Sequence, residues 1–205
     1  LYEEKGEDCL KELNGIFSFA IYDKKRGKLF LARDRAGVKP LYYYFDGKKL
    51  IFSSEIKGVL AHGIARSVNR EGLKHYFRLF FVPSPLTLFK GINKLRPAHY
   101  LVYKDGKVII QRYWEIKDLP EIRSKGKAVE GIKSLLRDSV KRQLISDRPL
   151  GIFLSGGIDS SSVLGVASEF LPDKVKTYSV GFNYSKGIEN YMDLERFNTK
   201  YNQDF

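Results

Sequence analysis

The stretch LGIFLSGGIDSSSVLG, Leu150 to Gly165, places a short apolar run directly before a loop of glycine, serine and aspartate. The run LGIFL is bounded by turn residues and is short, which predicts a strand buried on both faces. The loop is followed by apolar residues at helical spacing, and the later segment KTYSVGF is typical of a second strand. A strand, loop, helix and strand in this order predict a parallel pair joined by a right-handed crossover.

The loop itself is suited to binding an anion. In a parallel sheet, ligands bind where strands end and helices begin, because the first amides of a helix have no partner inside it. Gly156 and Gly157 leave the backbone open to an approaching anion. Further hydroxyl donors are available from Ser155, Ser160 and Ser161. The composition therefore favours a phosphate site.

Asp159 distinguishes this loop from the common P-loop, in which glycine is followed by lysine and then serine or threonine. A carboxylate in place of a cation suits a phosphate site if it holds a magnesium ion that bridges the phosphates. A capped turn explains the same residues without a ligand, since serine and aspartate favour helix starts and glycine favours sharp connections. The loop composition leaves both interpretations open.

The residues before this stretch predict a separate, mainly antiparallel part. Three pairs of strand-like segments are joined by turns at residues 24–27, 46–47 and 105–106. Helices are expected over residues 1–13, over Glu55–Leu60 and after Asn69. Pro83 and Pro85 are expected to end the last of these helices.

Between the two parts, the polar residues 118–127 contain proline and glycine and indicate a linker. Apolar residues then recur at helical spacing from Val129 to Leu144, which predicts an amphipathic helix ending near Asp147 and Pro149.

The composition limits the classes of protein to which the chain can belong. With 205 residues and 43% hydrophobic residues, the chain can bury a core. It has no apolar run long enough to span a membrane and no secretory pattern, so we expect a cytoplasmic protein. One cysteine and three histidines exclude a disulfide within the chain and a histidine–cysteine metal cluster. The net charge of +12 raises nucleic acid as a partner, but the basic residues are spread out, which favours a solubilising surface.

Several segments carry a resemblance to known families. SGGIDSS at Ser155–Ser161 resembles the pyrophosphate-binding loop of the ATP pyrophosphatase group, which transfers AMP to an acceptor oxygen. Three segments at 13–23, 32–44 and 52–60 resemble the later part of the class II glutamine amidotransferase domain. With KLRPAHYLVYKDG and RYW at 94–114, the order of these blocks is similar to glutamine-hydrolysing asparagine synthetases over essentially the whole chain. Ala98 departs from that family, which usually has glycine there, and this puts a local turn in doubt.

The resemblance implies a fold in two parts. Residues 1–117 would be the later portion of an α+β glutaminase domain of the Ntn type, built on antiparallel sheets and incomplete. After the linker at 118–127, residues 128–205 would begin an α/β nucleotide-binding domain with a parallel sheet, of the adenine nucleotide alpha hydrolase-like type and also incomplete. The chain is accordingly expected to be an internal fragment, inactive by itself.

The resemblance also implies a reaction and a site. Ammonia from glutamine hydrolysis would convert aspartate to asparagine through a β-aspartyl-AMP intermediate, with ATP and Mg²⁺ as cofactors. The expected small-molecule substrates are aspartate, glutamine and ATP, and whether the chain forms a homodimer stays open. Asp159 is the candidate magnesium contact, and Val180 matches the position that packs the adenine ring or is an ordinary core valine. The nucleotide-binding candidates are Leu154, Ser155, Gly156, Gly157, Asp159, Ser160 and Val180.

No catalytic residue of a glutaminase is identified. The family's nucleophile is a mature N-terminal cysteine, whereas position 1 is leucine here and Cys9 lies inside an expected helix. A structural role is favoured over catalysis for four polar residues, Arg33, Asp34, Lys39 and Glu55.

Three other functions remain alternatives. A related amidotransferase would act on another carboxylate. A tRNA-thiolating enzyme is disfavoured because no cysteine follows Cys9. A non-catalytic basic module would bind nucleotide or nucleic acid.

Overall fold

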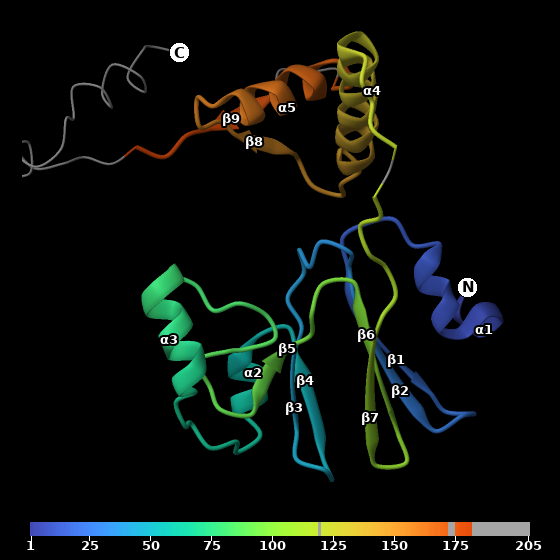
Figure 1. Cartoon of the computed structure of the whole chain (residues 1–205), viewed down its shortest axis with the longest axis vertical. Helices are drawn as coiled ribbons and strands as arrows, with labels where there is room; N and C mark the ends of the chain where they lie inside the picture. Colours follow the sequence, from blue (N-terminus) through green and yellow to red (C-terminus); the bar gives the residue numbers. More distant parts are fainter. Residues whose placement is uncertain (119, 172–174, 182–205) are drawn as a thin grey trace, which may run out of the picture. The chain divides into compact units, whose positions relative to one another are not determined.

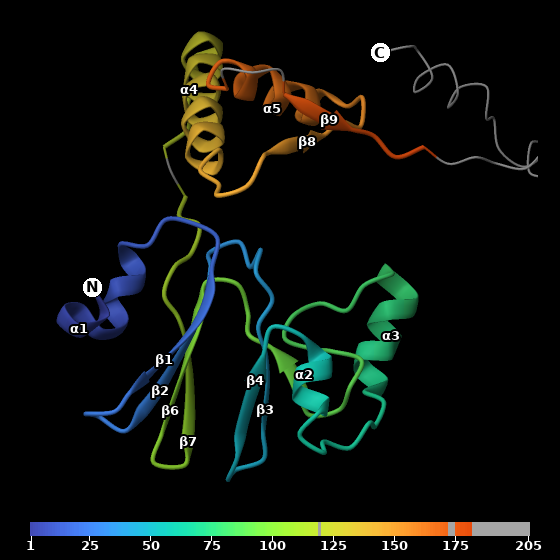
Figure 2. The ribbon, with the colours of Figure 1, turned by 180° about the vertical axis from the view of Figure 1, so that it is seen from behind.

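The computed structural model describes residues 1–118, 120–171 and 175–181. The chain divides into two compact units, Leu1–Asp118 and Leu119–Phe205. Figure 1 and Figure 2 show the elements of each unit from opposite sides. Among the described residues, no helix combines the length and the apolar composition needed to cross a bilayer.

The first unit is built on two antiparallel sheets. The four-stranded sheet has the order β1 (Ser18–Asp23), β2 (Lys28–Arg33), β6 (His99–Lys104), β7 (Lys107–Arg112). The three-stranded sheet has the order β4 (Leu50–Ser53), β3 (Tyr42–Phe45), β5 (Ile92–Lys94). All three predicted hairpins are confirmed, with β1 paired to β2, β3 to β4 and β6 to β7. Strand β5 was not predicted, because three residues are too few to show an alternating pattern.

The alternation of side chains in β2 places the core on both faces of the four-stranded sheet. Phe30 and Leu31 are both fully buried although they point to opposite faces. One buried cluster lies against the N-terminal helical segment and contains Cys9, Leu10, Phe30 and Ala32. A second cluster lies between the two sheets and contains Leu31, Leu41, Leu95 and Leu101.

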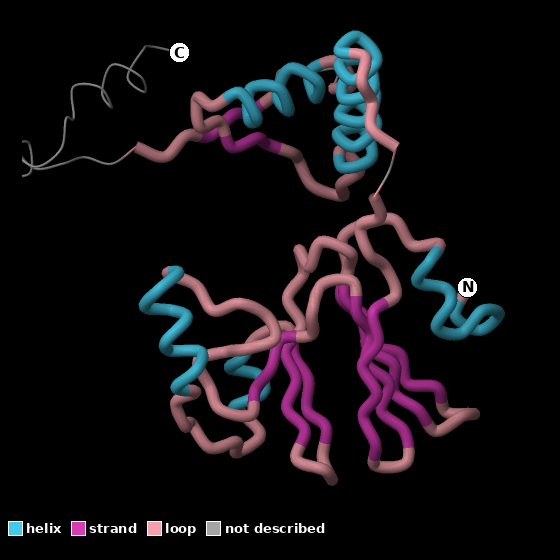
Figure 3. Tube along the Cα trace, viewed as in Figure 1, coloured by secondary structure: helices cyan, strands magenta, loops and turns pink. Residues whose placement is uncertain are grey.

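A third cluster joins the three-stranded sheet to α2 (Ile56–Leu60) and contains Ile51, Val59 and Ile92. The first unit is therefore layered as helical segment, sheet, sheet and helix, and Figure 3 shows the two sheets in magenta between the helices. This arrangement confirms the predicted α+β class with antiparallel sheets.

The helices of this unit lie where the sequence analysis expected them. The N-terminal helix is divided into two segments, and α3 ends before the expected prolines. The expected helix over residues 1–13 is split into α1 (Tyr2–Lys5) and a 3₁₀ segment η1 (Gly6–Lys11), because Gly6 takes a φ of 58°. The amide groups of Glu71 and Gly72 donate to the Asn69 side chain, which caps α3 (Arg70–Leu79) as predicted. The helix ends before Pro83, because Phe80 adopts the left-handed conformation.

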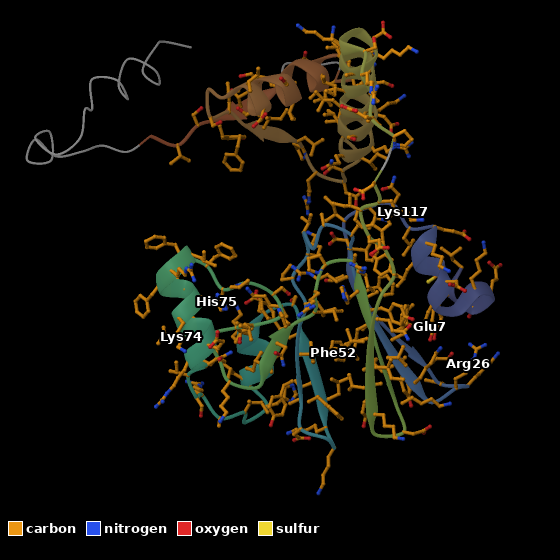
Figure 4. The ribbon with its side chains drawn as sticks, viewed as in Figure 1. Glu7, Arg26, Phe52, Lys74, His75 and Lys117 are labelled. Carbon is orange, nitrogen blue, oxygen red and sulfur yellow. The ribbon has the colours of Figure 1, made fainter. Side chains whose placement is uncertain are left out.

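A partly buried ion pair fixes the N-terminal segment to the sheet. The Lys28 Nζ donates to Glu7 Oε1 at 2.6 Å, and Lys28 is only 9% exposed (Figure 4 labels Glu7). Burial alone would lower the pKa of Lys28, but the hydrogen bonds of its ammonium group with Glu7 and Tyr2 raise the pKa overall. The charged form of Lys28 is therefore stabilised in the folded chain.

The second unit contains α4 (Lys125–Gln143), β8 (Gly151–Phe153), α5 (Ile158–Ser168) and β9 (Lys176–Tyr178). Strands β8 and β9 are parallel, as predicted. Helix α4 begins inside the expected linker, where the Ser124 side chain accepts from the Lys127 amide. Arg137 forms an ion pair with Glu169 and lies 4.8 Å from the ring centre of Phe170, which joins α4 to the end of α5.

The prediction that LGIFL is buried on both faces is wrong for the described residues. Phe153 in β8 is 76% exposed, and both Gly151 and Phe153 face solvent. The physical reason is that β9 is the only strand paired with β8 among the described residues, so little of the chain covers the strand. The expected strand in KTYSVGF is shorter than predicted, and its Phe182 lies outside the described residues.

Candidate functional site

The candidate site is the loop between β8 and α5, which Figure 3 shows leaving the strand and entering the helix. Its start is fixed by two hydrogen bonds across the parallel pair. The Leu154 amide donates to the Tyr178 carbonyl at 2.8 Å, and the Ser179 hydroxyl donates to the Leu154 carbonyl at 2.7 Å. The backbone of Leu154 is thereby held on both sides, and the loop leaves the sheet from a fixed position.

The loop turns sharply at Gly156, which has a φ of 74°. This backbone conformation strains residues with a side chain, so glycine is required by the turn. Gly157 is extended and caps α5, whose first backbone hydrogen bond runs from the Ser161 amide to the Gly157 carbonyl at 3.1 Å. The amides of residues 158–160 therefore have no acceptor inside the helix.

The serine hydroxyls of the loop close it on itself. The Ser155 amide donates to Ser160 Oγ at 3.2 Å, and Ser160 Oγ donates to the Gly157 carbonyl at 3.2 Å. The hydroxyls of Ser155 and Ser160 are 3.1 Å apart. Two of the three hydroxyls expected to face a ligand, those of Ser155 and Ser160, are thus used within the loop. The backbone amides of residues 156–160 have no acceptor in the described part of the chain.

The predicted nucleotide residues come together at one edge of the sheet. Because Phe153 pairs with Tyr178 in parallel register, the segments after both residues emerge at the same edge. The loop follows β8, and Val180 follows β9. Val180 is 76% exposed, so its interpretation as a core valine does not hold for the described residues, while its contact with adenine stays a prediction.

Asp159 is the charged side chain of the loop. Asp159 lies exposed in the first turn of α5, where a carboxylate interacts favourably with the positive end of the helix dipole. No group of three or more potential metal-ligating His, Cys, Asp or Glu side chains occurs among residues 1–118, 120–171 and 175–181. A divalent cation at Asp159 would therefore need most of its ligands from a bound phosphate and from water.

Two of the polar residues that the sequence analysis considered in the first unit, Arg33 and Asp34, form hydrogen bonds with backbone groups. Arg33 donates to the carbonyls of Lys39, Leu95 and Gly37, at 2.7, 2.6 and 2.5 Å respectively. The carboxylate of Asp34 accepts from the amides of Val38 and Lys39, each at 3.0 Å. The structural interpretation is confirmed for Arg33 and Asp34, because both side chains are used to hold the loop at residues 35–39.

The two other residues, Lys39 and Glu55, make local contacts. The Lys39 amide binds Asp34, and Glu55 precedes α2 and pairs with Lys57 at 2.6 Å. Cys9 is 2% exposed in η1, and burial raises the pKa of its thiol. A buried thiol with a raised pKa is a poor nucleophile, which agrees with its exclusion as the catalytic cysteine.

The structure adds two residues that sequence analysis did not consider. Tyr178 and Ser179 fix Leu154 through the hydrogen bonds described above, and the Tyr178 ring also covers Gly151. A Cβ atom on Gly151 would lie 2.5 Å from Tyr178 Cε2, so a larger residue there would displace the Tyr178 ring. A glycine at the start of a predicted strand was the available signal, since it often marks the close approach of another group.

Family models match both units. A model described as a glutamine amidotransferase domain matches residues 1–114, and a model described as asparagine synthase matches residues 131–198.

Individual relatives agree with these models. The chain is 46% identical over 188 residues to a Methanocaldococcus jannaschii protein assigned as a glutamine-hydrolysing asparagine synthetase, covering 89% of this chain and 36% of that protein. It is 44% identical over 187 residues to asparagine synthetase (glutamine-hydrolysing) 3 of Bacillus subtilis, covering 88% of this chain and 30% of that protein. The amidase chry2 of Gibberella zeae is 34% identical over 207 residues, which cover 92% of this chain and 30% of the amidase. The chain spans about a third of the length of these curated relatives.

Proposed function

The chain belongs to the glutamine amidotransferase domain family, and we propose that its protein is a glutamine-hydrolysing asparagine synthetase. In this proposal the protein is a carbon–nitrogen ligase that takes nitrogen from glutamine and forms asparagine from aspartate. The first unit is part of the glutaminase, and the second unit begins the ATP-dependent synthetase. The agreement of two family models, in this order along one chain, supports the assignment.

The proposed reaction follows from the poor reactivity of a carboxylate towards ammonia. The side-chain carboxylate oxygen of aspartate attacks the α-phosphorus of ATP, and pyrophosphate leaves to give β-aspartyl-AMP. Ammonia then attacks the activated carbonyl carbon, AMP leaves with the electron pair of the broken bond, and the nitrogen loses a proton to water to give asparagine. Binding and alignment of the leaving pyrophosphate are the tasks proposed for the loop between β8 and α5.

One observation carries the proposed phosphate-binding role of the loop: the backbone amides of residues 156–160 have no acceptor within the described residues, at the end of a parallel strand. Amides at the start of a helix bind phosphate oxygens, and Gly156 and Gly157 leave room for them. Asp159 would hold Mg²⁺ as a single carboxylate that shares the ion with the phosphates, as is usual for Mg²⁺ at nucleotide sites. Bound Mg²⁺ would neutralise part of the phosphate charge.

Calorimetric titration of the 205-residue chain with ATP, with and without Mg²⁺, tests this assignment. We expect Asp159→Asn to weaken binding of Mg-ATP by about tenfold and to change binding of metal-free ATP far less. Asp147→Asn is the matched control, because it makes the same chemical change at an exposed residue before β8 and should leave both affinities unaltered. Equal affinities of the wild type and Asp159→Asn for Mg-ATP would exclude Asp159 as a magnesium ligand.

A related amidotransferase with another acceptor is the second candidate, and the similarity to a protein named an amidase favours it. The nucleotide loop would be the same in both cases, so ATP binding does not separate them. The product of the whole reading frame should be assayed with glutamine, Mg-ATP and either aspartate or other carboxylates. Asparagine formation supports the synthetase, whereas amidation of a different carboxylate alone supports the second candidate.

A further inference from the structure

A cleft of about 670 Å³ opens in the first unit, outside every residue assigned above to the nucleotide loop. It lies where β6 begins and β7 ends, since His99 and Arg112 both line it and are paired in register. Its polar and aromatic lining consists of Ser84, Arg96, His99, Arg112, Trp114 and Glu115. The volume is in the range of small-molecule sites.

The walls of the cleft are held in place by backbone hydrogen bonds and by one lysine. Lys94 Nζ donates to the Val82 carbonyl at 2.6 Å, and the Lys94 amide donates to the Pro85 carbonyl at 2.7 Å, which fixes the loop that carries Ser84. On the other wall, Ala98 donates to the Asp34 carbonyl and accepts from the Tyr113 amide, each at 2.9 Å. The cleft is therefore preformed.

A buried polar atom without a hydrogen-bond partner, the Ser84 Oγ, belongs to the wall of the cleft and points to an occupant. Among the side chains that the structure describes, only Ser84 Oγ and Arg35 Nε are buried with no partner. Ser84 lines the cleft, and the Arg35 guanidinium lies 5.5 Å from the ring centre of Trp114, which also lines it. Buried polar groups nearly always have partners, so the unpaired Ser84 hydroxyl in the wall of the cleft requires an explanation.

The charges around the cleft indicate the chemistry of that occupant. Arg112 is paired with Glu115, whereas Arg96 is exposed and forms no ion pair or hydrogen bond with the described residues. A guanidinium group presents a fork of donors that matches the two oxygens of a carboxylate or phosphate. The indole of Trp114 adds an aromatic wall.

We propose that this cleft binds a small molecule bearing an oxyanion, a carboxylate or a phosphate, with Arg96 and the Ser84 hydroxyl as its donors. All of the residues that line the cleft lie between residues 84 and 116, and none of them is among the residues proposed to bind ATP.

Trp114 provides the measurement, because it is the only tryptophan in the chain. The 205-residue chain is titrated with inorganic phosphate and, separately, with L-glutamate, against sodium chloride at the same ionic strength, while tryptophan fluorescence is recorded. We expect a saturable change with at least one of the two anions, and the comparison shows whether phosphate or carboxylate is preferred. Arg96→Gln should weaken the binding by at least about tenfold, because a charge-assisted hydrogen bond is lost.

Arg26→Gln is the matched control. It removes the same charge from the turn between β1 and β2, where Lys28 pairs with Lys104, and so at the other end of the sheet from His99 and Arg112 (Arg26 is labelled in Figure 4). Its affinity should stay within about twofold of the wild type. Ser84→Ala is a second variant that changes no charge, and we expect it to weaken the binding as well. Circular dichroism checks that each variant is folded.

Absence of any saturable change with either anion would overturn the proposal. Equal weakening by Arg96→Gln and Arg26→Gln would also overturn it, because that result indicates diffuse attraction to a basic protein. Asp159→Asn should leave this binding unchanged, so the outcome is separate from that of the ATP experiment.

Discussion

The backbone amide of Phe80 donates to the carbonyl of Tyr76 at 2.8 Å and closes α3 with a left-handed residue. Phe80 has a φ of 58° and a ψ of 14°, values that glycine adopts without strain. Its side chain is 85% exposed, so the ring recovers little energy from packing.

Phe80→Gly should therefore raise the free energy of unfolding by about 1 kcal/mol, since the left-handed conformation costs other residues roughly that much. Phe77→Gly is the matched control, because it makes the same substitution at a 73% exposed residue inside α3. Glycine within a helix should lower the stability by up to about 1 kcal/mol. Urea unfolding measures both, and a loss of stability in Phe80→Gly would contradict the strain argument.

Asp34 should make the stability of the chain depend on pH. The residue is 1% exposed, and this burial would raise its pKa, but the amides of Lys39 and Val38 lower the pKa below its ordinary value overall. A carboxyl group with a lowered folded pKa stabilises the fold above its unfolded pKa, near 3.8, and this contribution is lost as the pH falls through the folded pKa.

Asp34→Asn should lower the stability by about 1–3 kcal/mol at pH 7, because the amide side chain offers one acceptor oxygen instead of two. The difference from the wild type should shrink between pH 5 and the folded pKa of Asp34. Urea unfolding at several pH values provides the comparison. A stability difference that stays constant across this range would show that the charge of Asp34 does not matter.

Cys9 should be unreactive in the folded chain. Its burial and the raised pKa of its thiol both reduce the amount of accessible thiolate at pH 8. We expect labelling by a thiol reagent to be at least about a hundredfold slower than in urea, since it requires local opening. The signal is unambiguous, because the chain has one cysteine. Rapid labelling of the native chain would reopen Cys9 as a candidate nucleophile.

Local patterns predicted most of the first unit. Its hairpins were found because alternating apolar residues flank turn residues such as Asp105 and Gly106, which both have positive φ in the structure. The turn at Ala98 forms with a φ of 58°, although the residue is not glycine, because its backbone is bound to Asp34 and Tyr113. Strand β5 was missed because its three residues show no alternating pattern, and its pairing with β3 joins residues far apart in the sequence.

The path of the chain around the candidate loop was predicted only in outline, and the binding of nucleotide there stays a prediction. The composition of the loop and the parallel pair located residues 154–160 and Val180 at one edge of the sheet. The hydroxyls of Ser155 and Ser160 form hydrogen bonds within the loop. These bonds depend on the three-dimensional path of the loop, which composition does not determine. The cleft at Arg96 was missed for a similar reason, because Ser84 and Arg112 meet only after the sheets have formed.

The central claim is that the amides of residues 156–160 bind the phosphates of ATP. Two-dimensional ¹H–¹⁵N NMR of the chain, titrated with Mg-ATP, observes these amides directly. The account predicts that the largest saturable shifts fall on Gly156, Gly157 and the first turn of α5. Binding that leaves these amides unshifted, or that shifts only residues elsewhere in the chain, would contradict it.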